Sequence, residues 1–151
     1  MKNYLAAAFV LLASSAGFAQ TKTLSDYSGQ YDGAVCVMSD AGTLSPFFVR
    51  LTFNGSTVTM DTVDEGNNVR NGDTAFASVN VYGGLTATFN HNGRTLKFGI
   101  AFDDKTPDKL IGTASMIFAD GHDDTELVSL RKTYGGTIAG YAQAHPDVCS
   151  E

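Results

Sequence analysis

The chain has 151 residues, and its 10 basic and 16 acidic residues give a formal net charge of −6 at pH 7. This length is that of a single domain. Phosphate binding requires clustered Lys and Arg, and here the basic residues are scattered, so the composition argues against a nucleic-acid partner and favours cationic partners or metal ions.

The first element in chain order is an export signal. Residues 1–20 read MKNYLAAAFVLLASSAGFAQ, with one lysine, a short apolar run and small residues ending at Ala19. These are the three parts of a secretory signal peptide, and the apolar run is shorter than the roughly 20 residues that span a bilayer. We therefore expect residues 1–19 to be cleaved and residues 20–151 to form one domain. The mature protein would be exported to the periplasm or outside the cell, soluble and not embedded in a membrane.

Apolar and polar residues alternate from Gln30 to Lys132, with the period of half-buried strands. Hairpin signals such as Asn54-Gly55 and Asn92-Gly93 interrupt the alternation. Eight strands are predicted at residues 30–38, 47–53, 58–60, 76–82, 85–89, 96–102, 109–118 and 125–132. Consecutive hairpins predict an all-β, eight-stranded antiparallel up-and-down barrel, because closure removes both exposed edges. A β-sandwich is the alternative, and alternation does not separate the two.

One face of each predicted strand is apolar and defines a candidate interior. The residues assigned to it are Val35, Val37, Phe47, Val49, Leu51, Phe53, Met60, Phe89, Phe98, Ile100 and Phe102. An eight-stranded barrel can be filled by its own side chains or can hold one small ligand. Both outcomes stay open, and if the barrel is hollow the candidate ligand contacts are Phe47, Val49, Leu51, Phe89, Phe98 and Ile100.

The tail after Thr133 is predicted to contain one short helix at residues 138–144, although Gly140 lowers its helix propensity. Cys36 and Cys149 lie near opposite ends of the mature chain, and an oxidising compartment favours their pairing. Strand parity places Cys36 on the outer face, where a tail packed on the barrel wall could reach it. Such a bridge would contribute about 4 to 5 kcal/mol by the chain-entropy model, and two buried thiols are the alternative.

Alternate connections of a meander lie at the same end, so residues 39–45, 64–73, 91–94 and 119–124 are expected to cluster. Their titratable side chains would ring one mouth of the barrel: Asp40, Asp64, Glu65, Asp73, His91, Asp120, His122, Asp123 and Asp124. The opposite end would carry the tight turns at Asn54-Gly55 and Gly83-Gly84.

Within this ring, Asp120, His122 and Asp124 are candidate metal ligands, with His91 or Asp64 arriving from neighbouring loops. Carboxylate oxygens suit calcium or magnesium, and a histidine nitrogen suits zinc or another transition ion. Their spacing matches no established metal-binding loop, and a solvated hairpin turn explains the same residues. We therefore expect neither a bound metal nor another cofactor.

Gly29-Gln30-Tyr31 opens the first strand, and Arg131 or Lys132 lies late in the last strand. In these features the chain resembles the lipocalin-type barrels of the calycin group, where a basic residue late in the last strand covers an aromatic on the first. The family's aromatic is usually Trp, and this chain has no Trp. The resemblance implies a small, mostly apolar ligand that enters at the end with the longer loops. A disulfide between tail and barrel is also common in that group.

Motifs for catalysis are missing, including Gly-x-Ser-x-Gly and the phosphate-binding Gly-x-x-x-x-Gly-Lys, so we do not expect an enzyme. Two functions remain. The first is a carrier or sequestering protein that binds a small apolar ligand through an acidic mouth. The alternative is an interaction protein or inhibitor whose acidic loops bind a cationic protein partner. Asn54-Gly55-Ser56 is a glycosylation sequon if the source is eukaryotic, and His145 is expected at the surface.

Overall fold

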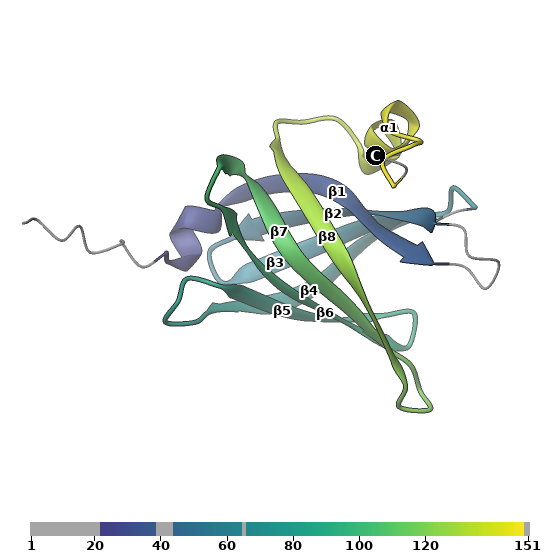
Figure 1. The fold of residues 1–151 in the computed structure, drawn as a ribbon, viewed down its shortest axis with the longest axis horizontal. Helices are drawn as coiled ribbons and strands as arrows, with labels where there is room; N and C mark the ends of the chain where they lie inside the picture. The colour runs from purple at the N-terminus through teal and green to yellow at the C-terminus, as the bar shows by residue number, and fades with distance from the viewer. Residues whose placement is uncertain (1–21, 39–43, 65, 150–151) are drawn as a thin grey trace, which may run out of the picture.

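The computed structural model describes residues 22–38, 44–64 and 66–149 (Figure 1). In chain order its elements are a 3-10 helix η1 (Leu24–Tyr27), the strands β1 (Gly29–Met38), β2 (Leu44–Asn54), β3 (Thr57–Val63), β4 (Val69–Val79), β5 (Leu85–His91), β6 (Arg94–Asp103), β7 (Thr106–Ile117) and β8 (Asp123–Thr133), and the helix α1 (Ile138–Ala144). The predicted signal peptide, Asp40 and Glu65 lie outside the described residues. No helix in the described part of the chain combines the length and the apolar character needed to cross a membrane.

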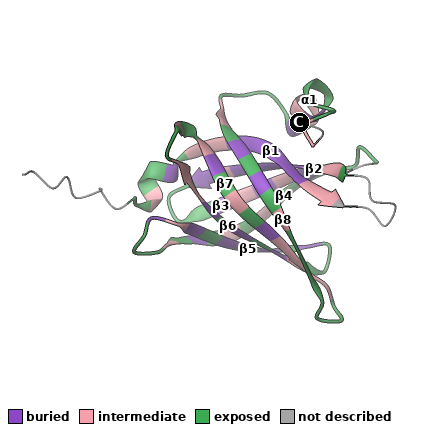
Figure 2. Cartoon of the chain, viewed as in Figure 1, coloured by how far each residue is buried: buried purple, intermediate pink, exposed green. Residues whose placement is uncertain are grey.

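The strands form a closed barrel in which each strand pairs with the next along the chain, and β1 pairs with β8. All pairs are antiparallel. The structure therefore confirms the eight-stranded antiparallel up-and-down barrel and excludes the β-sandwich. Buried and exposed residues alternate along β5 and through the second half of β8, as expected for strands with one face on a core (Figure 2).

The predicted strands agree with the observed ones to within three residues at either end, except at the fourth. That strand was expected at residues 76–82, and this prediction is wrong: β4 runs from Val69 to Val79. Its first residues are polar and mostly exposed, so they lack the apolar alternation that marks a strand. They pair with β3 through a register shift between Met60 and Thr62. The turn after β4 begins at Asn80, whose N–H donates to the carbonyl of Gly84.

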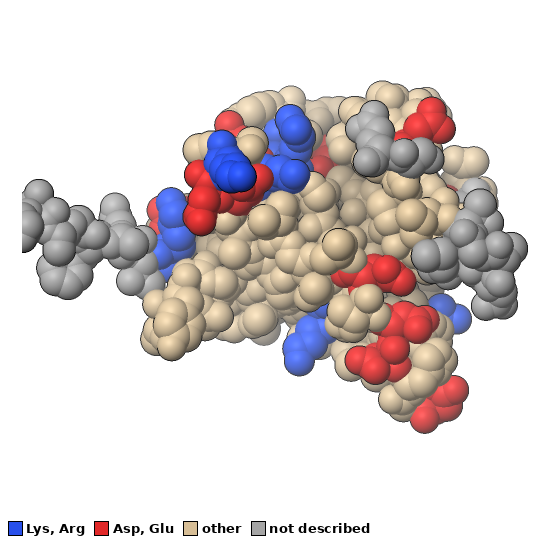
Figure 3. Space-filling model, viewed as in Figure 1, with Lys and Arg blue, Asp and Glu red and all other residues tan. Residues whose placement is uncertain are grey.

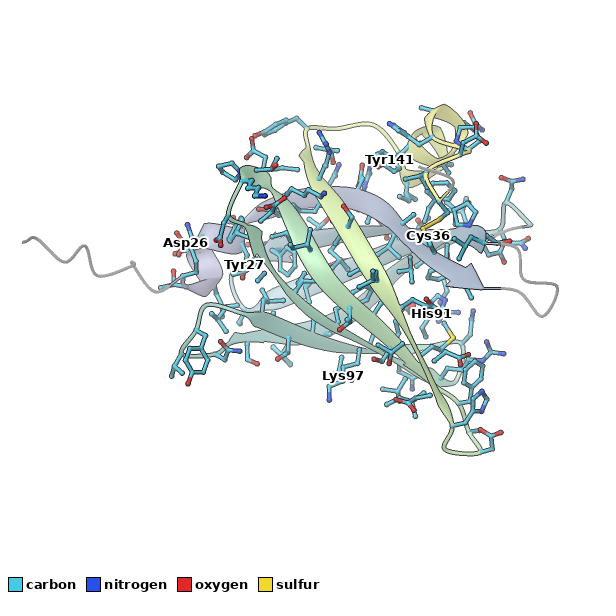
Figure 4. The ribbon with its side chains drawn as sticks, viewed as in Figure 1. Asp26, Tyr27, Cys36, His91, Lys97 and Tyr141 are labelled. Atoms are coloured by element: carbon cyan, nitrogen blue, oxygen red, sulfur yellow. A yellow bond between two sulfur atoms is a disulfide. The ribbon has the colours of Figure 1, made fainter. Side chains whose placement is uncertain are left out.

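All eleven residues assigned to the interior belong to the main core cluster or pack against it. The helix η1, which was not predicted from the sequence, adds Tyr27 to one end of this core. Tyr27 is fully buried, its ring centroid lies 4.5 Å from that of Phe102, and its hydroxyl donates to the carbonyl of Gly83. Figure 4 shows Tyr27 inside the end that η1 covers. This end of the barrel is packed with side chains.

The C-terminal helix α1 lies where it was predicted, and it packs on the outside of the barrel. The Thr137 hydroxyl caps its first turn by accepting a hydrogen bond from the Gly140 N–H at 3.1 Å. Ile138 and Ala142 of α1 form a second apolar cluster with outward-facing residues of β1, β2 and β3. Beside this cluster, Cys36 and Cys149 form a disulfide with a Cα–Cα distance of 5.5 Å. The predicted bridge is thus confirmed, and the alternative of two free thiols is excluded.

A buried ion pair on the outer wall joins the same tail to the barrel. Asp32 accepts hydrogen bonds from Nε and Nη2 of Arg50 at 2.7 and 2.8 Å. The hydrogen bonds to Asp32 raise the pKa of Arg50, against the opposing effect of its burial. Arg50 also donates to the carbonyl of Gly136 at 2.9 Å, which fixes the segment leading into α1.

Candidate ligand-binding cavity

A cavity of about 940 Å³ opens at the end of the barrel opposite η1. Inward-facing positions of the strands form its wall. Asp64, Gly66 and Asn68 from the β3–β4 connection and Asn92 from the β5–β6 turn form part of its edge. Its apolar lining consists mainly of Val37, Phe47, Leu96, Ala114, Met116 and Phe118. The volume lies within the range of about 300 to 1,000 Å³ that is typical of small-molecule sites.

The six predicted ligand contacts divide between this cavity and the packed core. Phe47 lines the cavity. The other five, Val49, Leu51, Phe89, Phe98 and Ile100, are buried in the core cluster and are not among the lining residues. Phe89 and Phe98, for example, meet edge to face with centroids 5.9 Å apart. The barrel is therefore filled toward η1 and hollow toward the other end.

The connections predicted to cluster at one mouth do so, as far as they are described. Asp64, His91 and Asp124 come from three of them or from their borders, and all line the same cavity. Asp120 and His122 lie at the tip of the β7–β8 hairpin, with side chains 72% and 56% exposed. Acidic side chains gather over this hairpin at the lower right of Figure 3. Asp73 is part of β4 rather than of a loop, although it contacts the cavity wall through His91.

Two arginines at the mouth were not singled out from the sequence. Arg70 and Arg94 both line the cavity, so the mouth is of mixed charge rather than uniformly acidic. Arg70 lies in the polar half of β4, where the lack of apolar alternation predicts a loop. Arg94 lies two residues before Leu96 and four before Phe98, so the alternation along the strand places its side chain on the same inward face. This spacing was the sequence feature that could have identified Arg94 as a cavity residue. Its guanidinium carbon lies 4.7 Å from the centroid of the Phe118 ring.

The buried side of the cavity wall contains a hydrogen-bonded cluster centred on Asp73. The Nδ1 atom of His91 lies 2.6 Å from Oδ2 of Asp73, and Nη2 of Arg70 lies 3.0 Å from Oδ1. Burial opposes ionisation of Asp73, but the hydrogen bonds from Arg70 and His91 outweigh it and hold the pKa of Asp73 below its ordinary value. His91 is only 4% exposed, meets the ring of Phe47 edge-on at 5.8 Å, and lies inside the mouth in Figure 4.

The three candidate metal ligands do not converge. Nδ1 of His122 lies 2.7 Å from Oδ1 of Asp120, and this hydrogen bond lowers the pKa of Asp120. The His122 ring stacks on Phe118 at 4.2 Å, whereas Asp124 faces the cavity. Within residues 22–38, 44–64 and 66–149, no group of three or more His, Cys, Asp or Glu side chains is arranged to hold a metal ion. The turn itself is a hairpin connection closed by the Gly121 N–H donating to the carbonyl of Phe118.

The residues behind the family resemblance meet at the packed end of the barrel. Nζ of Lys132 lies 5.8 Å from the centroid of the Tyr31 ring, while Arg131 is exposed on the outer wall. The closed eight-stranded antiparallel barrel is consistent with a calycin-like fold. No protein-family model matches the chain, and no curated protein matches it. The architecture is thus established by the strand pairing alone.

Proposed function

We propose that this protein binds a small ligand with a largely apolar body in the open end of its barrel, as a carrier or sequestering protein. The observation that carries the proposal is the cavity of about 940 Å³ with its apolar inner wall. The packed layer around Phe89 and Phe98 closes the cavity from below. A ligand that enters from the mouth would therefore bury one end and leave its other end near the polar rim.

Two further features support an exported ligand-binding protein of lipocalin type, in the periplasm or outside the cell. The contact of Lys132 with Tyr31 is the pairing expected from the resemblance. The disulfide between Cys36 and Cys149 suits an oxidising compartment, which agrees with the expected signal peptide.

Titration with N-phenyl-1-naphthylamine, a neutral apolar dye that fluoresces on leaving water, tests the proposal. We expect saturable binding of one dye per chain. Phe47→Ala should weaken dye binding several-fold, because Phe47 lines the cavity. Phe76→Ala is the matched control, since Phe76 is 82% exposed on the outer wall. Dye uptake that never saturates, or equal effects of the two substitutions, would contradict the proposal.

A second function is supported by the exposed acidic hairpin between β7 and β8 (Figure 3). In this alternative the hairpin binds a cationic protein, and the barrel serves as its rigid support. Binding to cytochrome c, used as a basic probe protein, should then weaken steeply with added salt and on Asp120→Asn substitution. Such binding without saturable dye uptake would favour the alternative over the carrier.

A further inference from the structure

Two carboxylates project into the cavity from consecutive inward positions of β8. Asp124 and Glu126 line the cavity, and the next inward residues along β8, Val128 and Leu130, belong to the core. Asp123, the first residue of β8, faces outward, because successive side chains of a strand point to opposite faces. Glu126 pairs in register with Ala114, a small residue that leaves room beside its side chain.

Two other charged groups of the cavity are hydrogen-bonded within the protein. Arg70 donates hydrogen bonds to Asp73 and to Asn92. Asp64 accepts hydrogen bonds from the backbone and side chain of Asn68. By contrast, neither Asp124 nor Glu126 has an ion pair or a side-chain hydrogen bond with any residue in the described ranges. Arg94 also has no carboxylate partner in those ranges, but it is exposed at the rim, where it lies against Phe118 and the sulfur of Met116.

His91 lies on the wall formed by β5. It is more than nine-tenths buried and lines the cavity. Its Nδ1 atom is hydrogen-bonded to Asp73, and its Nε2 atom lies 3.4 Å from Nδ2 of Asn92. Both ring nitrogens therefore have partners within the protein, as Arg70 and Asp64 do.

Inside the rim, the charged groups left for a ligand are thus carboxylates, and we infer that the cavity selects organic cations: a protonated amine attached to an apolar body. This inference rests on the proposed function and names its ligand class. The ammonium group binds the carboxylate of Glu126, with Asp124 adding negative charge nearer the mouth. The apolar body packs against Phe47, Leu96 and Met116.

The depth of Glu126 makes it the principal contact. Through the strand register, Glu126 is level with Ala114 and Phe98, whereas Arg94 is the first residue of β6 at the rim. Glu126 is half-buried and Arg94 is exposed. A cation that reaches Glu126 is therefore separated from the rim arginine by a layer of side chains. A partly desolvated carboxylate forms stronger charge-assisted hydrogen bonds than an exposed one.

Three probes with the same indole ring test the inference: tryptamine, which is cationic, tryptophol, which is neutral, and indole-3-propionate, which is anionic. The protein has no Trp, so an indole probe excited at the red edge of its absorption, where tyrosine absorbs little, reports binding by its fluorescence anisotropy. We expect tryptamine to bind at least about tenfold more tightly than tryptophol, and indole-3-propionate to bind most weakly. Glu126→Gln should remove most of the preference for tryptamine.

Asp123→Asn is the matched control, because it removes one negative charge from the outer face of the same strand and should leave the preference unchanged. Circular dichroism and the urea midpoint establish that each variant is folded. Equal binding of tryptamine and tryptophol, equal effects of Glu126→Gln and Asp123→Asn, or uptake of the naphthylamine dye without any indole probe would overturn the inference alone. Absence of dye binding as well would remove the proposed function too.

Discussion

Nδ1 of His91 lies 2.6 Å from Oδ2 of Asp73, which joins the end of β5 to the middle of β4 at the wall of the cavity. Arg70 contacts the same carboxylate from the rim. The Asp73 side chain is 12% exposed and that of His91 is 6% exposed, so water does little to screen the contact. This cluster fixes the orientation of the imidazole that faces the ligand space.

Asp73→Asn should lower the free energy of unfolding at pH 7 by about 1 to 3 kcal/mol, because the neutral amide has one acceptor oxygen in place of the two carboxylate oxygens that bond Arg70 and His91. The pKa of Asp73 is below its ordinary value in the folded protein. Its stabilisation is therefore fully present above the unfolded pKa of about 3.9 and is lost as pH falls through the lower folded value. Urea unfolding should show a gap between wild type and variant that persists from pH 7 to pH 5 and narrows below about pH 4. The exposed Asp104→Asn serves as the control, and a gap that closes between pH 7 and pH 5 would contradict the assignment.

Phe98 and Phe47 should respond differently to truncation, because one fills the core and the other lines the cavity. Phe98→Ala should lower the free energy of unfolding by about 3 to 5 kcal/mol, as expected for a fully buried phenylalanine. Phe47→Ala should lower the free energy of unfolding less than Phe98→Ala does, and it should weaken dye binding more. Denaturant unfolding and dye titration on both variants measure the two effects, and a larger stability loss at Phe47 would show that the packed and hollow regions are misassigned.

Removing the disulfide should destabilise the barrel without altering the cavity. The bridge joins residues 113 positions apart, and the loss of a native disulfide from a small domain typically costs about 2 to 5 kcal/mol. We expect Cys149→Ser to lower the urea midpoint. Its affinity for the naphthylamine dye should stay within about twofold of wild type, because α1 packs on the outer wall. A parallel loss of dye affinity would show that the tail supports the cavity.

The close pairing of β6 and β7 makes Gly112 intolerant of a side chain. A Cβ atom at Gly112 would collide with the carbonyl oxygen of Gly99 and lie 2.8 Å from Cα of Ile100. We therefore expect Gly112→Ala to cost at least about 1 to 3 kcal/mol of stability, the usual cost of overpacking. At Gly99 on the partner strand a Cβ atom would meet only Oγ1 of Thr113, at an ordinary 3.7 Å. Gly99→Ala is therefore the matched control, and its midpoint of thermal unfolding should be well above that of Gly112→Ala.

The sequence predicted the features that depend on neighbouring residues. Alternation along residues 96–102 predicts a strand and identifies its apolar face, because side-chain direction in a strand repeats every two residues. The Asn92-Gly93 pair predicts the hairpin turn that precedes this strand. The short helix at residues 138–144 and the pairing of the only two cysteines were predicted for similarly simple reasons.

Three features were missed because they depend on contacts between distant segments. The polar start of β4 is a strand only because β3 pairs with it, and η1 matters because Tyr27 inserts among Phe53 and Phe102. The mixed charge of the mouth follows from bringing Arg70 and Arg94 to the same rim as Asp64.

By itself, the sequence determined a series of antiparallel strands, the apolar face of each, and the single possible cysteine pair, since pattern, turns and cysteine number are local or countable properties. Closure into a barrel rather than a sandwich, and formation of the bridge, were decided by the tertiary structure. Only the tertiary structure decided that the barrel is solid around Phe98 and hollow around Glu126. The inward faces of all eight strands are read from the sequence as one apolar set, but whether they meet across the axis depends on closure, register and the plug formed by Tyr27. Those are relations between segments far apart in the chain, and no single strand carries them.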